Sequence, residues 1–259
     1  GQSSMVGAIL QYGTYVTVSD QLKLHAIDDV ILGATEELGA SAGTTQDKLV
    51  RDVLAAGTNV QYADKIGAND AHTAVTTRAG MDKTSRLTPT EVNKAVTTLK
   101  KQHVPTINGK YVAIIHPSVA YDLRQSKEWI EAHKYAAVTE LFNGEIGELH
   151  GVRFIETTEA KIWNNSTCPV KTAAVSGGAA ATYYSVYSTL FLGKDAFGMI
   201  DPEGGSLEMI IKSERESGGP LNQFSTLGYK FSTATKILYQ ERMLRVESLS
   251  EYSDVDAAN

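Results

Sequence analysis

Cysteine is nearly absent from this sequence: its 259 residues include a single one, Cys168. One thiol cannot form an internal disulfide, and it cannot supply the paired cysteines of a structural zinc site. We therefore expect no disulfide framework, and assembly in a reducing compartment.

An excess of positive charge and long hydrophobic runs are also absent from the sequence. The formal net charge is −6, which argues against a nucleic-acid groove built on bulk positive charge. No apolar run approaches the ~20 residues that a membrane helix needs. The start, GQSSMVGAILQYG, has no basic stretch and is not a signal peptide. It also lacks an initiator methionine, so we expect that a natural amino-terminal segment precedes it.

Hydrophobic residues make up 42% of the chain and charged residues 21%, which is ordinary for a folded protein. Residues 9–18, ILQYGTYVTV, are rich in β-branched and aromatic residues and predict a strand. An apolar stripe at helical spacing follows, made of Leu24, Ile27, Ile31, Ala34, Leu38, Ala42, Leu49 and Val53. It indicates either one helix over 20–56 or two helices broken at GASAGTT. Because the stripe keeps its phase through both glycines, we expect the single helix.

Later segments alternate between helix and strand signals, which indicates an α+β fold. Thr88-Pro89-Thr90-Glu91 is a capping box, and it predicts the start of a helix. A strand is expected at Tyr111–Ile115, and Pro117 opens another helix. Residues 58–87 are polar and predict an extended loop, and a small-residue loop is expected over 164–182.

Two β segments are expected to close the chain. SLEMIIKSE is the first, and a longer run follows in which Leu227, Tyr229 and Phe231 alternate with polar residues. This alternation predicts a strand with one buried face.

His116, at the end of a predicted strand, is the most tempting catalytic candidate. The six histidines show no metal-binding spacing. NGEIGELHG lacks the lysine and hydroxyl of a phosphate-binding loop, and no nucleophile motif is present. We therefore expect no catalytic residue, cofactor or metal, and we expect the His116 imidazole to cap backbone groups.

Five strings of residues carry a family resemblance: QYGTYVTVSD, AIIHPSVAYDLRQSKEWIEAHKY, LFNGEIGELHGVRFIETTEAKIW, GKDAFGMID and PLNQFSTLGYKFSTATKILYQERMLRVE. In this order, from about Gln11 to Glu247, they resemble a major capsid protein family of tailed bacteriophages. That family is similar in fold to the Hong Kong 97-type capsid protein.

The resemblance implies a division into three parts. Residues 1–18 would be the returning half of an extended loop. A peripheral domain would comprise 19–100 and 201–259, with 20–56 as its spine helix, and an axial domain would comprise 101–200.

The resemblance also implies a function: self-assembly into hexamers and pentamers of an icosahedral head that encloses double-stranded DNA. Implied partners are a portal, scaffolding or decoration proteins, and packaged DNA without sequence specificity. No membrane partner is implied. The implied location is the virion, after assembly in the host bacterial cytoplasm.

The strand over 1–18 does not have enough local sequence to build a second layer, so we expect a neighbouring subunit to cover it. The candidate subunit-contact residues are Tyr12, Tyr15, Val16 and Val18. Two alternatives stay open. One is an α+β enzyme with a site near Gly144–Gly151, and the other is a different virion component, such as a tail or decoration protein.

Overall fold

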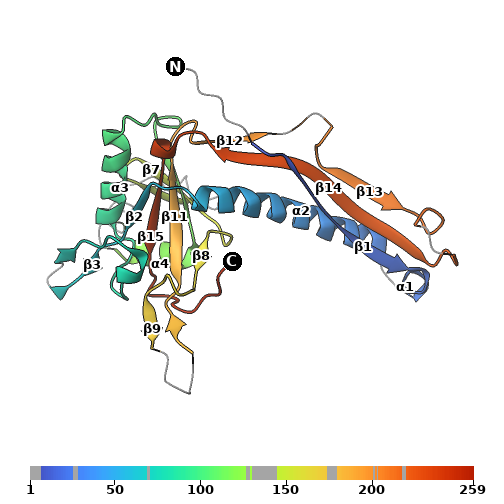
Figure 1. The fold of residues 1–259 in the computed structure, drawn as a ribbon, viewed down its shortest axis with the longest axis horizontal. Helices are drawn as coiled ribbons and strands as arrows, with labels where there is room; N and C mark the ends of the chain where they lie inside the picture. The colour runs from blue at the N-terminus through green and yellow to red at the C-terminus, as the bar shows by residue number, and fades with distance from the viewer. Residues whose placement is uncertain are drawn as a thin grey trace. The chain divides into compact units, whose positions relative to one another are not determined.

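The computed structural model describes residues 7–25, 29–68, 71–126, 129, 145–173, 180–200, 202, 204–217 and 220–259 (Figure 1). Within these ranges the chain forms two compact units. The small unit comprises 1–50 and 197–236, and the large unit comprises 51–196 and 237–259. No helix among the described residues is both long enough and apolar enough to cross a membrane.

The small unit is a sheet packed on a helix. Strand β14 (Phe224–Ile237) pairs along one side with β1 (Leu10–Ser19) and on the other side with β12 (Phe197–Ile200) and β13 (Glu208–Lys212). Helix α1 (Asp20–His25) follows β1, and helix α2 (Val30–Ala55) comes next. The predicted alternation of β14 is confirmed, because Leu227, Tyr229 and Phe231 are buried in the cluster that contacts α2.

Helix α2 runs without interruption through Gly39 and Gly43, so the predicted break at GASAGTT does not occur. The single helix predicted over 20–56 is nevertheless wrong at its start. Residue 29 is not helical and separates α2 from α1, while 26–28 lie outside the described residues. Asp29 accepts hydrogen bonds from the backbone N–H groups of Ile31 and Leu32, which caps the new start.

Gly39 has open space around it, since no atom would lie within 4 Å of an added methyl group. We expect Gly39→Ala to raise the free energy of unfolding by about 0.5–1 kcal/mol, because alanine loses less backbone entropy in a helix. Chemical denaturation of the unassembled protein measures this value. A destabilisation would contradict the continuous helix at this position.

The large unit is built on a seven-stranded sheet in the order β2-β15-β11-β5-β7-β6, with β8 paired to β11. These strands are β2 (Val60–Tyr62), β5 (Tyr111–Ile115), β6 (Glu145–Leu149), β7 (Val152–Glu156), β8 (Ile162–Trp163), β11 (Val186–Leu192) and β15 (Met243–Ser248). Parallel pairs occur at β15–β2 and β5–β7, and the other pairs are antiparallel. The closing strands β14 and β15 thus belong to different sheets. The predicted peripheral domain, 19–100 and 201–259, therefore includes residues of both units.

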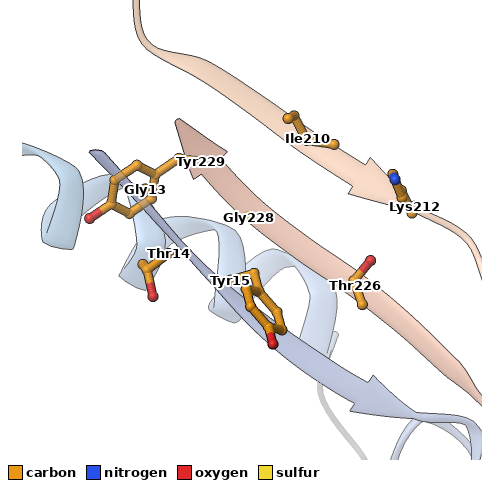
Figure 2. A pocket seen from close by; sticks show the side chains of 8 residues that line it. All are labelled: Gly13, Thr14, Tyr15, Ile210, Lys212, Thr226, Gly228 and Tyr229. Carbon is orange, nitrogen blue, oxygen red and sulfur yellow. The ribbon is translucent and has the colours of Figure 1, made fainter. Parts of the chain in front are cut away.

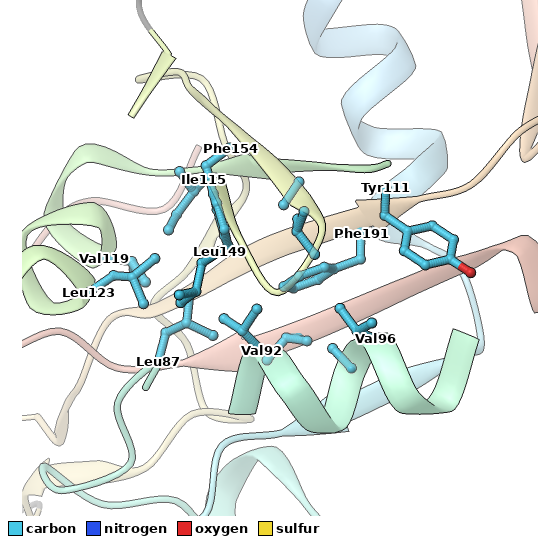
Figure 3. Close-up of a cluster of buried hydrophobic side chains, with 14 of the residues drawn as sticks. Leu87, Val92, Val96, Tyr111, Ile115, Val119, Leu123, Leu149, Phe154 and Phe191 are labelled. Atoms are coloured by element: carbon cyan, nitrogen blue, oxygen red, sulfur yellow. The ribbon is translucent and has the colours of Figure 1, made fainter. Parts of the chain in front are cut away.

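One face of this sheet is covered by α3 (Pro89–Lys101) and α4 (Pro117–Gln125). Figure 3 shows Val92 and Val96 of α3, and Val119 and Leu123 of α4, directed into the core around Phe191. The predicted capping residue is confirmed, since Thr88 Oγ1 accepts a hydrogen bond from the N–H of Glu91.

Two predicted loops contain more structure than expected. Residues 58–87 include β2, β3 (Lys65–Ile66), β4 (His72–Thr73) and a 3-10 turn at Arg78–Gly80. Residues 164–182 contribute β9 (Val170–Thr172) to a pairing with β10 (Thr182–Tyr183). A second 3-10 turn, Gln240–Arg242, precedes β15. β2 depends on a distant partner, β15, whereas β3 pairs with the nearby β4 and β9 with the nearby β10; strands of two or three residues are too short for a periodic pattern to reveal.

Candidate subunit-contact surface

The inner face of the small-unit sheet is buried within the chain itself. Val18 of β1 packs with Leu38 and Ala42 of α2 and with the three alternating residues of β14. Tyr12 is partly buried against the same cluster, and its ring lies 5.8 Å from that of Phe231. Helix α2 therefore supplies a second layer on this face of the sheet, and coverage of β1 by a neighbouring subunit stays a prediction.

The outer face of the same sheet is open to solvent. Tyr15, Gly228 and Ile210 lie in one cross-strand row of β1, β14 and β13. Because the middle residue has no side chain, the row encloses a hollow of about 380 Å³, which Figure 2 shows between the Tyr15 ring and Ile210. Thr226 and Lys212 line its other side.

Gly228 and Gly13 both allow close approach of the strands. A methyl group on Gly228 would lie 2.9 Å from the backbone oxygen of Thr14, and one on Gly13 would lie 2.4 Å from the backbone oxygen of Tyr229. Real side chains do not tolerate such contacts, so both positions require glycine. The hollow is therefore a consequence of tight strand packing.

Exposed apolar side chains are concentrated in the small unit. Of the twenty large hydrophobic residues that are exposed in the described parts of the chain, thirteen belong to this unit, which holds about a third of the sequence. They include Leu24 at 80% exposure, Leu221 at 74% and Tyr15 at 72%. This unit is therefore the candidate location of a subunit contact.

The structure separates the four predicted contact residues. Tyr15 and Val16 are exposed, at 72% and 44%, and can be covered by a partner. Val18 is only 2% exposed, so contact with a neighbouring subunit could bury almost no further surface of this residue. Tyr12 is partly buried within the chain. Sequence reasoning missed Leu24, which it assigned to the buried stripe of a long helix. The sequence signal that could have identified it is its spacing from Leu22, because residues two positions apart do not lie on the same face of a helix.

A cluster of titratable groups lies in the large unit, between the start of α3 and the strands β2 and β4. Carboxylate or imidazole atoms of Asp64, His72 and Glu91 lie within 4.8 Å of one another. The Lys94 ammonium contacts Asp64 and lies 3.0 Å from Glu91 Oε1, so this one cation pairs with both carboxylates. The cluster is thus accounted for by ion pairing within the chain.

His116 caps α4, as predicted. Its Nδ1 accepts a hydrogen bond of 3.2 Å from the backbone N–H of Ser118, and its ring lies 4.9 Å from that of Tyr187. Burial lowers the pKa of the His116 imidazole, opposed in part by the charges of Asp256 and Glu156. The neutral form is therefore favoured, and this form can accept the capping bond.

We expect His116→Gln to lower the free energy of unfolding by about 0.5–1.5 kcal/mol, the value of one hydrogen bond. Ile115→Ala should cost more, at about 2–5 kcal/mol, because Ile115 is fully buried. Thermal midpoints and the yield of assembled particles should follow this order. A larger loss from His116→Gln would contradict the capping role.

The segment around Gly144–Gly151, where an enzyme site was considered, forms a β-hairpin. β6 and β7 pair antiparallel, and the turn between them places His150 and Gly151 at positive φ of 52° and 77°. Gly144 lies outside the described residues. Such a two-residue turn connects strands and needs no functional explanation.

The fold can be compared with solved structures. The capsid of Ralstonia phage GP4 is similar to this chain with a TM-score of 0.68 and 14% identity, over 96% of this chain and 76% of that chain. For the head of Helicobacter pylori bacteriophage KHP40 the TM-score is 0.65 and the identity 12%, over 95% and 76%. The SrpI encapsulin from Synechococcus elongatus PCC 7942 has a TM-score of 0.58 and 10% identity, over 97% and 78%.

These likenesses confirm the predicted α+β fold of the Hong Kong 97 type. No curated protein sequence matches the chain. A family model described as phage capsid protein does match, over residues 2–234. Its members are structural proteins of the virion, which confirms the prediction that the chain is not an enzyme. The alternative of an α+β enzyme is therefore wrong. The match covers most of the sequence, so the chain belongs to the phage capsid protein family.

Proposed function

We propose that the chain is the major subunit of an icosahedral phage head, which it builds as hexamers and pentamers around double-stranded DNA. The observation that carries this proposal is the exposed apolar surface of the small unit. Isolated subunits would leave this surface in water. A shell covers it by repeated contacts between identical copies, so each copy is stabilised by the lattice.

The division into an extended loop over 1–18, a peripheral domain over 19–100 and 201–259, and an axial domain over 101–200 is part of this proposal. The net charge of −6 suits an inner wall past which DNA can slide. A portal, and scaffolding or decoration proteins, are the further partners we propose. Assembly takes place in the host cytoplasm, where the single thiol stays reduced.

Tyr15→Asp tests the role of the exposed surface. Because Tyr15 is 72% exposed, we expect the unassembled protein to keep its free energy of unfolding within about 0.5 kcal/mol. Shells should fail to form, since the aspartate would be desolvated in every subunit contact. Sedimentation velocity distinguishes shells from unassembled protein.

Tyr252→Asp is the matched control, because Tyr252 is a comparably exposed tyrosine, at 69%, in the large unit. We expect this variant to assemble better than Tyr15→Asp. Equal shell yields for the two variants would contradict the special role of the small unit.

A further inference from the structure

One end of the large-unit sheet brings together segments that are far apart in the sequence. Strands β5, β7 and β15 begin at this end, and β6 and β11 end there. The pairing shows this, because Tyr111 lies opposite Val152 and Leu192 lies opposite Met243. The segments at this end are 100–110, 148–153, 193–195 and 239–242.

Positive charge is in excess in these four segments, although the whole chain has a net charge of −6. The segments contain six cationic residues and three acidic ones. The six cationic residues are Lys100, Lys101, Lys110, Arg153, Lys194 and Arg242.

Ion pairing within the chain uses only part of this charge. Lys110 contacts Glu148, and the Arg242 guanidinium lies 3.3 Å from the Asp195 carboxylate. Three exposed lysines have no ion-pair partner among the residues that the structure describes. We call them the basic end, and they are Lys100, Lys101 and Lys194.

The turns that carry these lysines are hydrogen-bonded to one another. Lys194 donates its N–H to the backbone oxygen of Pro105 at 2.9 Å, and Gly193 donates to that of Arg242 at 2.9 Å. His103, next to the end of α3, donates to the backbone oxygen of Lys100 at 3.0 Å. The 193–195 turn therefore joins the end of α3 to the 239–242 turn.

The dipole of α3 explains only part of the basic end. Lys100 and Lys101 lie in the last turn of this helix, where the dipole stabilises cations. Lys194 belongs to a different segment, so the helix gives no reason for its charge. The gathering of unpaired cations from separate segments indicates an anionic partner.

The surface around the basic end is polar, with one exposed aromatic ring. Tyr239 is 52% exposed, and the Arg242 guanidinium stacks on its ring at 4.2 Å. Ile107, at 36%, is the other large hydrophobic residue exposed in these segments. Protein interfaces have an apolar core, whereas DNA-binding surfaces are polar and positively charged. The surface therefore favours DNA over a protein partner.

We propose that the basic end binds the phosphate backbone of the DNA inside the head. The inference rests on the proposed function, because the head supplies the DNA. Lysine ammonium groups that contact phosphates carry no sequence information, so binding is independent of sequence. Because each copy contributes few cations and the whole chain is acidic, each contact is weak and salt-dependent, and the DNA can still move.

Fluorescence anisotropy of a labelled DNA duplex, titrated with unassembled wild-type protein, tests this binding. At low salt we expect binding that weakens as salt is added, with equal affinity for two duplexes of unrelated sequence. Lys194→Glu should weaken the affinity by about tenfold, because it replaces a phosphate contact with a repulsive charge.

Lys83→Glu is the matched control, because it makes the same change of charge at another exposed lysine of the large unit. Lys83 lies near the other end of β15, where the backbone oxygen of Ser85 accepts a hydrogen bond from Leu249. We expect it to weaken the affinity by less than about threefold, since salt screens charges that are far from the DNA.

Lysine acetylation of the wild-type protein, read by peptide mass spectrometry, locates the contact without any substitution. With saturating duplex, Lys100, Lys101 and Lys194 should be acetylated about fivefold or more slowly than without it. The acetylation rate of Lys83 should not change. This measurement decides the question if Lys194→Glu does not fold.

Three results would overturn the proposal. One is an equal loss of affinity in Lys194→Glu and Lys83→Glu, and another is no DNA binding by the wild type at low salt. The third is acetylation of the basic end at the same rate with and without DNA. If Lys194→Glu keeps its DNA affinity but forms no shells, the basic end is instead a contact with another protein.

The proposed function fails separately, if wild-type protein forms no shells under the electron microscope. The DNA measurements use unassembled protein, so the two failures are distinguishable.

Discussion

Replacing Glu247 with alanine is expected to lower the free energy of unfolding by about 3–5 kcal/mol. Glu247 is fully buried and accepts hydrogen bonds from Arg78 at 2.6 and 2.7 Å and from Arg245 at 2.9 Å. Arg78 stacks on the Trp163 ring at 4.0 Å, and the Arg245 guanidinium lies 5.3 Å from the same ring. Loss of the carboxylate leaves two largely buried cations without their shared anion.

Glu251→Ala is the matched control for this substitution. Glu251 also pairs with an arginine, Arg86, but its side chain is 55% exposed. Exposed pairs contribute only about 0–1 kcal/mol. Denaturant titration of both variants gives the comparison, and a loss at Glu247 no greater than that at Glu251 would contradict the account of the buried ion cluster.

Phe154→Ala is expected to lower the free energy of unfolding by about 3–5 kcal/mol, because it leaves a cavity in the large-unit core. Phe154 is fully buried on β7, with its ring edge-on to Trp129 at 5.8 Å and to Phe191 at 6.3 Å. Ile115 of β5 and Leu149 belong to the same buried cluster, which Figure 3 shows. Such aromatic pairs add to the energy of burial itself.

The next residue of the same strand is the control. Ile155 points to the opposite face of β7 and is 40% exposed. We expect Ile155→Ala to cost about 1 kcal/mol or less. Calorimetric unfolding of the unassembled variants measures both effects, and equal losses would mean that this core is not packed as described.

The sequence predicted those features that local chemistry determines. The Thr88 and His116 caps, the helix through Gly39 and Gly43, and the buried face of β14 all follow from patterns a few residues long. In each case the capping atom or the apolar spacing is present in the segment that folds. The fold as a whole was predicted from the family resemblance.

Features that depend on distant partners were not predictable in this way. In the sequence, Glu247 is one more polar residue of a predicted strand. Its partner Arg78 is 169 positions away along the chain, so the ion pair is evident only in the folded structure. Val18 was expected at an interface because its partners on α2 and β14 are not evident from its own segment.

Electron microscopy of the purified wild-type protein under assembly conditions is the most direct test of the central claim. The account predicts closed icosahedral shells in which copies of this chain form both hexamers and pentamers. Tubes or rings would assign the chain to another virion structure, and particles of single subunits under all conditions would contradict self-assembly into a phage head.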